Sequence, residues 1–117
     1  MSPVRPRARP TGRSLGKAAP VFAALGDQTR LGLVARLSAG EPLSITRLTE
    51  GTDLTRQAVT RHLEVLSDAG LVRSSRHGRE RLWELERARI ELARRSLDQI
   101  SRWWDEKLAA LKASVEE

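Results

Sequence analysis

Apolar residues recur every three or four positions over residues 55–69, which is the spacing of one face of a helix. The stripe consists of Val59, Leu63 and Leu66, with Ala58, Val65 and Ala69 beside it. Thr55 precedes the stripe and is suited to cap the first turn, and Gly70 is suited to end the helix. The pattern therefore predicts an amphipathic helix with one buried face and one exposed face.

Three shorter helices are predicted before this one. The first covers residues 17–25, and the second begins after a cap at Asp27 and ends at about residue 37. The third covers residues 45–50 and follows a cap at Ser44. The residues expected to face inward are Leu31, Val34, Ala35 and Leu37 in the second helix and Ile45 and Leu48 in the third. These spacings predict that three helices pack against the amphipathic helix that follows them.

The segments between these helices indicate how they are connected. Residues 41–43 (Glu-Pro-Leu) favour a short edge strand, because proline cannot donate a hydrogen bond to a neighbouring strand. Helix 45–50, turn 51–54 and helix 55–69 form a helix-turn-helix pattern, joined by a turn that contains glycine.

The apolar pattern becomes extended over residues 71–85. Two runs, 71–75 and 81–85, flank a segment in which Gly78 suits a tight turn, so a β-hairpin is predicted. Its basic tip contains Arg76, His77, Arg79 and Arg81. A hairpin directly after a helix-turn-helix is the layout of a winged helix, in which the tip contacts the DNA backbone or the minor groove. The alternative is a solvated turn.

Residues 87–115 form one long predicted helix with a sustained apolar stripe. The stripe consists of Ile90, Ala93, Leu97, Ile100, Trp104, Leu108, Leu111 and Val115. So small a core cannot cover it, and Trp103 and Trp104 add the kind of apolar area that is enriched at interfaces. We predict a dimer through the first and last helices; the candidate interface residues are Phe22, Leu97, Ile100, Trp103, Trp104, Leu108 and Leu111. The alternative is intramolecular packing with an exposed, frayed end.

Together these elements predict a mainly helical winged helix-turn-helix with a small β-hairpin, in the order α-α-β-α-α-β-β-α. The folded domain is expected over residues 17–115, with the dimerisation helix at 87–115. Residues 1–16 are rich in Pro, Gly and Arg, and are expected to form a disordered basic arm. Two interpretations of this arm stay open: a solubilising tail, or a segment that contacts phosphates or the minor groove.

The charge distribution sharpens the prediction. The 117 residues carry a net charge of +6, but residues 27–117 hold 16 basic and 15 acidic groups, a balance of only +1. Within that part, residues 54–81 hold six Arg and three acids, whereas residues 98–117 hold three basic and five acidic groups. Positive charge therefore gathers around the helix-turn-helix and hairpin, as a DNA-facing surface requires.

The exposed side of helix 55–69 near its start has the chemistry to recognise bases. Arg56, Gln57, Thr60 and Arg61 lie there. Arginine can donate two hydrogen bonds to guanine, glutamine can pair with adenine, and a hydroxyl can reach a phosphate or a base edge. This segment is therefore predicted to be the recognition helix, with double-stranded DNA as partner.

Two segments resemble the ArsR/SmtB family of bacterial repressors. Val59-Thr60-Arg61-His62-Leu63 with Ala69-Gly70-Leu71-Val72 is similar to that family's recognition segment, and residues 24–31 (Ala-Leu-Gly-Asp-Gln-Thr-Arg-Leu) are similar to its opening motif. The resemblance covers roughly residues 20–115 and implies a homodimeric repressor of a palindromic operator. It implies DNA contacts from Thr55, Arg56, Gln57, Thr60 and Arg61, with His62 near the backbone, and from the wing residues Arg76, His77, Arg79 and Arg81. It also implies that Leu63 and Leu66 lie in the core.

The chain departs from the metal-sensing members of that family. Their Cys motif would fall at residues 43–49, which read Leu-Ser-Ile-Thr-Arg-Leu-Thr, and the chain contains no cysteine. The last helix has no histidine; the two histidines, His62 and His77, lie on the recognition helix and the wing. We therefore predict no metal site and no cofactor. A small apolar ligand near Trp103 and Trp104 remains a hypothesis, weighed against plain packing of an aromatic pair.

Other function classes fit less well. The sequence has no nucleophile–base constellation, phosphate loop or metal cluster, so an enzyme is not expected. The lack of Tyr and the single Phe leave no stacking platform for RNA. A protein-interaction module using the aromatic last helix is the main alternative. No window approaches a membrane span and no apolar signal core is present, so a cytoplasmic protein is expected.

Overall fold

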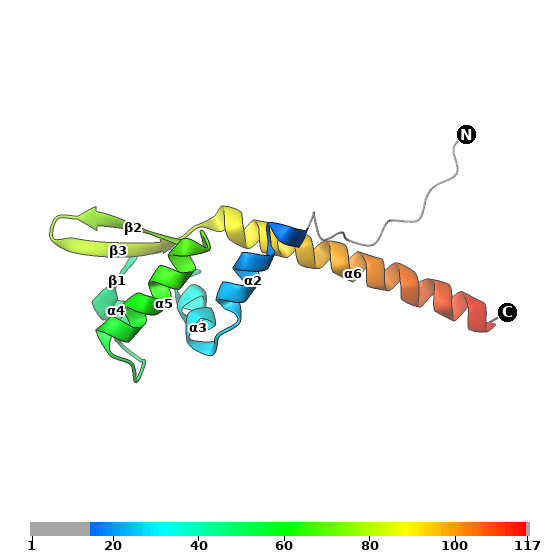
Figure 1. Ribbon diagram of the computed structural model, residues 1–117, viewed down its shortest axis with the longest axis horizontal. Helices are drawn as coiled ribbons and strands as arrows, with labels where there is room; N and C mark the ends of the chain where they lie inside the picture. Colours follow the sequence, from blue (N-terminus) through cyan, green and yellow to red (C-terminus); the bar gives the residue numbers. More distant parts are fainter. Residues whose placement is uncertain (1–14, 117) are drawn as a thin grey trace.

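The computed structural model describes residues 15–116, and Figure 1 labels its elements. The helices are α2 (Ala19–Leu25), α3 (Gln28–Leu37), α4 (Ile45–Thr49), α5 (Arg56–Asp68) and α6 (Arg87–Glu116). The strands are β1 (Leu43–Ser44), β2 (Val72–His77) and β3 (Glu80–Leu85). The predicted order of elements is confirmed. Of the expected basic arm, residues 1–14 lie outside the described residues, and Leu15 and Gly16 are helical.

Three helices begin where the sequence places a capping side chain. The carboxylate of Asp27 accepts a hydrogen bond from the backbone N–H of Arg30 at 3.0 Å. The hydroxyls of Ser44 and Thr55 accept from the N–H groups of Arg47 and Ala58 at 3.2 and 3.1 Å. Each cap satisfies one of the first-turn N–H groups that a helix leaves without an internal partner, which confirms the predicted starts of α3, α4 and α5.

The core lies beneath α5. Val59, Leu63 and Leu66 are completely buried, and they pack in one cluster with Leu48 and Trp83 among others. The prediction that Leu63 and Leu66 belong to the core is confirmed. Leu71 follows Gly70, whose φ of +77° ends the helix in the left-handed conformation that glycine adopts easily.

The predicted inner face of α3 was wrong in part. Leu31 is 54% exposed and Ala35 is also exposed, whereas Leu33, Val34 and Leu37 are buried. Leucines stand on two overlapping helical stripes here, and periodicity does not distinguish them. The packing of α3 against the core selects the stripe that contains Leu33 and Leu37, four residues apart.

The three strands form one antiparallel sheet in the order β1-β3-β2. β1 is the predicted edge strand, although it covers Leu43–Ser44 rather than residues 41–43. β2 and β3 remain paired as far as His77 and Glu80, so the turn is shorter than the predicted segment 76–80. Gly78 takes a φ of +67° at the first turn position, as a two-residue type II′ turn requires.

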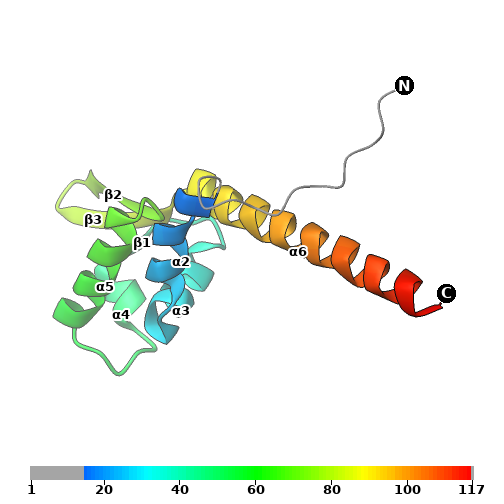
Figure 2. The ribbon, with the colours of Figure 1, turned by 45° about the vertical axis from the view of Figure 1, so that its right-hand side comes forward.

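Helix α6 begins against the core and then leaves it (Figures 1 and 2). Ala93 and Ser96 are its buried residues, and it packs on α2 along this part. Beyond them the apolar stripe is uncovered: Leu97 is 55% exposed, Leu108 57% and Val115 78%. Over residues 15–116, no helix combines the length and apolar character needed to cross a membrane.

Candidate nucleic-acid interface

The first two turns of α5 present three polar side chains to solvent. Arg56, Gln57 and Arg61 are exposed, and within residues 15–116 none of them has a hydrogen-bond or ion-pair partner. The hydroxyl of Thr60 donates to the carbonyl of Arg56 at 2.8 Å, and that of Thr55 caps the helix. The two arginines and the glutamine are thus available to an external ligand, whereas both hydroxyls already have a partner inside the helix.

His62, also expected near DNA, lies against the start of α3. Its Nδ1 is 3.4 Å from a terminal nitrogen of Arg30 and 3.8 Å from a carboxylate oxygen of Asp27. The backbone N–H of Arg30 lowers the pKa of Asp27, with smaller contributions from the charges of Arg30 and His62. His62 therefore connects α5 to the start of α3 and, unlike Arg61, already has partners within the protein.

The structure gives residues 24–31 a role that sequence reasoning did not assign. The Nε of Arg30 donates to the carbonyl of Ala24, near the end of α2, at 2.6 Å. The same guanidinium reaches His62 on α5. This segment therefore joins the end of α2 and the start of α3 to α5. The family resemblance pointed to residues 24–31, but the spacing of residues along the chain could not predict a contact between Arg30 and His62, which are 32 positions apart.

The wing, which is β2, β3 and the turn between them, carries the predicted basic residues on paired strands as well as at its tip. Arg76 lies directly opposite Arg81, and His77 lies opposite Glu80. Arg81 donates to the Ser74 hydroxyl at 3.0 Å. Its guanidinium lies 4.9 Å from the centre of the Trp83 ring. The side chains of Arg76 and Arg79 are exposed and have no partner among the described residues.

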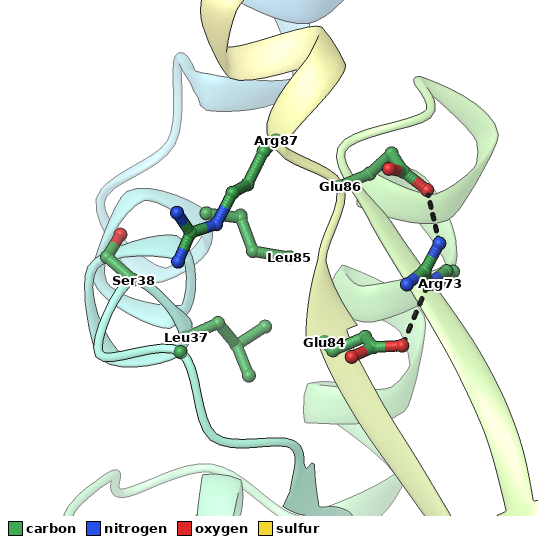
Figure 3. Close-up of a pocket in the computed structure, with 8 residues that line it drawn as sticks. Leu37, Ser38, Arg73, Glu84, Leu85, Glu86 and Arg87 are labelled. Carbon is green, nitrogen blue, oxygen red and sulfur yellow. Dashed lines mark hydrogen bonds and ion pairs between the residues drawn. The ribbon is translucent and has the colours of Figure 1, made fainter.

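The base of the wing is held by an ion-pair network that sequence reasoning missed. Arg73 on β2 donates to Glu84 on β3 at 2.8 Å and to Glu86 at 3.2 Å (Figure 3). Its hydrogen bond with Glu84, followed by the charges of both carboxylates, raises the pKa of Arg73 above its usual value. The network borders a cavity of about 240 Å³ between the end of α3 and the start of α6. The ion-pair network could have been predicted from the hairpin register, because a register that pairs residues 76 and 81 also pairs residues 73 and 84.

The predicted interface residues on α6 differ in exposure. Ile100 and Trp103 are half-buried within one chain, as is Phe22 on α2, whereas Leu97, Trp104, Leu108 and Leu111 are more than half exposed. The rings of Trp103 and Trp104 meet edge to face with centroids 5.5 Å apart, and the Lys107 ammonium lies 5.6 Å from the centre of the Trp103 ring. A solvent-exposed apolar stripe of this length is typical of a helix that packs against another chain.

The part of the chain covered by residues 15–116 contains no group of three or more His, Cys, Asp or Glu side chains placed to hold a metal ion. His62 and His77 lie on different elements, and each has a neighbour of its own: Arg30 for His62, and the Ser75 hydroxyl, at 3.2 Å, for His77.

Comparison with known proteins places this geometry among transcriptional regulators. Residues 25–75 match a family model described as a helix-turn-helix domain. The chain is 43% identical over 68 residues to the HTH-type transcriptional regulator YuzN of Bacillus subtilis, covering 53% of this chain and 74% of the relative. It is 37% identical over 81 residues to the HTH-type transcriptional regulator Rv2034 of Mycobacterium tuberculosis, covering 69% of this chain and 72% of the relative.

Solved structures show the same likeness. An ArsR-like transcriptional regulator from Rhodococcus sp. RHA1 superposes with a TM-score of 0.73 at 35% identity, covering 86% of this chain and 94% of that one. A second ArsR family transcriptional regulator superposes with a TM-score of 0.69 at 27% identity, covering 76% of this chain and 97% of that one.

Proposed function

The chain belongs to the ArsR family of helix-turn-helix transcriptional regulators, and from this membership we propose that it is a homodimeric repressor of a palindromic operator. It is a transcriptional regulator with a helix-turn-helix DNA-binding domain rather than an enzyme. In the proposal, α5 enters the major groove, the wing lies along the neighbouring backbone, and two copies pair through α2 and α6. The protein acts in the bacterial cytoplasm, without a metal ion.

The single observation that carries this proposal lies at the start of α5, where the side chains of Arg56, Gln57 and Arg61 have no hydrogen-bond or ion-pair partner among residues 15–116. Their side chains provide two guanidinium groups and one amide. A guanidinium group can pair with guanine, and an amide can pair with adenine, in the major groove. The amino end of α5 adds the positive end of a helix dipole, which favours a nearby phosphate. We assign base readout to Gln57 and Arg61, and supporting contacts to Arg56, Thr55 and Thr60.

The wing supports the same proposal through its unfavourable charges. Arg76 and Arg81 are like charges directly opposite each other in a β-ladder, an arrangement that destabilises an isolated hairpin. A phosphate backbone beside the wing would attract both guanidinium groups and so offset the repulsion between them. Arg79 at the turn and His77 beside it extend the same surface. We therefore assign phosphate contacts to the wing residues.

The exposed stripe on α6 supports a dimer. Leu97, Trp104, Leu108 and Leu111 present a continuous apolar face that a single chain leaves in water. Half-sites that are read by dimeric helix-turn-helix proteins lie about 34–36 Å apart, one turn of DNA, so the proposed dimer has to present its two α5 helices at that spacing. Pairing also explains why a domain of this size extends a long helix beyond its own core.

Metal independence rests on ligand chemistry. The chain lacks cysteine, and its two histidines belong to the surfaces assigned to DNA contact or to the start of α3. Carboxylates alone make a poor site for zinc, nickel or cobalt. We therefore propose that the signal, where one acts, is an organic ligand or a protein.

The test is fluorescence anisotropy of the purified protein on its own upstream DNA and on a scrambled sequence, at several salt concentrations and with excess EDTA. We expect binding that prefers the upstream DNA, survives EDTA and weakens steeply with salt, because phosphate neutralisation releases counterions. Loss of binding in EDTA would contradict metal independence. The same measurement can be made with a library of genomic DNA fragments. If these fragments and the scrambled sequence bind equally weakly, the repressor function is contradicted.

One observation favours a second candidate function. Trp104 is 54% exposed on a helix that projects from the domain, so α6 could bind a different protein. In that interaction module the winged helix would serve as a scaffold. A protein that is monomeric at micromolar concentration and has no salt-dependent DNA affinity would support this alternative.

A further inference from the structure

Helix α4, the first helix of the helix-turn-helix, has only five residues and cannot stabilise its own end. The last carbonyls of any helix lack partners within it. Here the carbonyls of Thr46 and Thr49 accept hydrogen bonds from the backbone N–H groups of Glu50 and Thr52, each at 3.1 Å. Those of Arg47, Leu48 and Glu50 receive their hydrogen bonds from outside the helix and the turn.

All three of those carbonyls are bound by one side chain on α3. A terminal guanidinium nitrogen of Arg36 donates to Arg47 at 2.7 Å. The other terminal nitrogen donates to Leu48 at 2.9 Å and to Glu50 at 3.0 Å. A cation at the carboxyl end of a helix also interacts favourably with the helix dipole. The guanidinium therefore satisfies the end of α4 by hydrogen bonds and by charge together.

These bonds act at the turn that leads from α4 into α5. The turn begins at Glu50, passes through Gly51 with a φ of +81°, and ends at the Thr55 cap. Within the turn, Thr52 supplies local bonds to Thr49 and Leu54. Those bonds hold the turn together but do not attach it to the rest of the domain. The bonds from Arg36 attach it to α3, whose Leu33 and Leu37 are buried in the core.

We propose that Arg36 is a positioning residue for DNA recognition: its three hydrogen bonds to the end of α4 set the orientation in which α5 presents Gln57 and Arg61. This inference rests on the proposed function, because it needs a DNA sequence for α5 to recognise. Arg36 itself contacts no DNA in the proposal. It acts on base readout, which depends on the direction of α5, and not on the phosphate attraction that the basic surface supplies at any sequence.

Lysine is the informative replacement. It keeps the charge, so the electrostatic attraction to any DNA stays the same, but its ammonium is a compact group that lacks the planar fork. It cannot reproduce the geometry in which two nitrogens serve three carbonyls. Arg95→Lys is the matched control, since Arg95 is exposed on α6 and lies outside the helix-turn-helix. A second variant, Arg36→Gln, removes the charge as well.

The experiment measures the ratio of affinities for operator and scrambled DNA, the salt slope of each, and amide hydrogen exchange. For Arg36→Lys we expect the affinity ratio to fall about tenfold, with an unchanged salt slope and unchanged affinity for scrambled DNA. The amides of Glu50 and Thr52 should exchange about tenfold faster, while those of Val59 and Leu63 remain protected. Arg95→Lys should match the wild type in every measurement.

Two results would overturn the inference. An unchanged affinity ratio together with unchanged exchange would show that the turn keeps its position without Arg36. An equal loss of affinity for both DNAs in Arg36→Gln, with a salt slope smaller by about one unit, would show that Arg36 contacts a phosphate directly. If the wild type shows no sequence preference, the proposed function fails and the role of Arg36 in DNA recognition fails with it, and the exchange rates of Glu50 and Thr52 then test only whether Arg36 holds the turn in place.

Discussion

Arg76 and Arg81 face each other across the two strands of the wing, and the register of β2 and β3 places them as a directly opposed pair. Only Arg81 has partners within the described residues, through Ser74 and the Trp83 ring. Arg76 is therefore the side chain of this pair that is available to a phosphate, and its replacement removes no side-chain hydrogen bond or ion pair among the described residues.

We expect Arg76→Ala to reduce the salt slope of DNA binding by about one unit, because one phosphate contact is lost. Affinity should fall by the same factor on operator and scrambled DNA. Removal of the opposed charge should leave the hairpin at least as stable as in the wild type. Anisotropy titrations across a salt series provide the measurement, with Arg102→Ala on α6 as control. A slope identical to that of the wild type would remove Arg76 from the interface.

Arg61→Ala should weaken operator binding by about 1–3 kcal/mol, since the predicted contact is a forked pair with a base edge. Binding to scrambled DNA should change much less, which distinguishes Arg61 from the wing residues. Ser67→Ala, a substitution on the exposed part of the same helix far from its start, controls for effects on the helix itself. Equal weakening on both DNAs would mean that Arg61 contacts the backbone instead.

Acid should weaken the start of α3 through Asp27. Its pKa is lowered in the folded protein, first by the backbone N–H of Arg30 and then by neighbouring charges, so its contribution is present above the unfolded pKa and is lost as pH falls through the folded value. We expect Asp27→Asn to be less stable than the wild type at pH 7, with a difference that narrows below about pH 4. Urea unfolding between pH 3 and pH 7 measures this. A difference that does not vary with pH would contradict the charge argument.

Two glycine-to-alanine substitutions should change stability in opposite directions. Gly32 lies inside α3, and a Cβ there would meet no atom within 4 Å. Gly32→Ala should therefore stabilise the fold by about 0.4–1 kcal/mol. Gly70 has a φ of +77°, and a Cβ would lie 2.8 Å from the Nε of Arg89. Gly70→Ala should destabilise by about 1–2 kcal/mol. Thermal unfolding followed by circular dichroism measures both changes. A change in stability of the same direction in both variants would contradict the prediction.

A charge placed on the exposed stripe of α6 should separate the proposed dimer. Leu108 is 57% exposed in one chain, so Leu108→Glu should leave the folded monomer intact and shift sedimentation toward the monomer. Ala113→Glu adds the same charge on a face roughly opposite the stripe, at about 100° per residue, and should leave the dimer unchanged. Equal effects of both variants would place the interface elsewhere.

Local signals were sufficient to predict the element order, the caps and the buried face of α5. The side chains of Asp27, Ser44 and Thr55 reach N–H groups three residues away, and Val59, Leu63 and Leu66 repeat within one helix. Such interactions are between near neighbours in the sequence, so spacing reveals them. The exposed start of α5 followed from the same periodicity, which is why the candidate recognition residues could be named in advance.

Contacts between distant segments were decided only by the tertiary structure. Packing buried Leu33 beside the expected Val34 and Leu37 and left Leu31 exposed, although either leucine satisfies helical periodicity. The bonds from Arg36 join α3 to residues 11 to 14 positions away, in the last turn of α4 and just after it. The proximity of His62 and Arg30 joins residues 32 positions apart. A linear pattern records which residues can share a face of one element, whereas the relative placement of two elements depends on how all their side chains pack together.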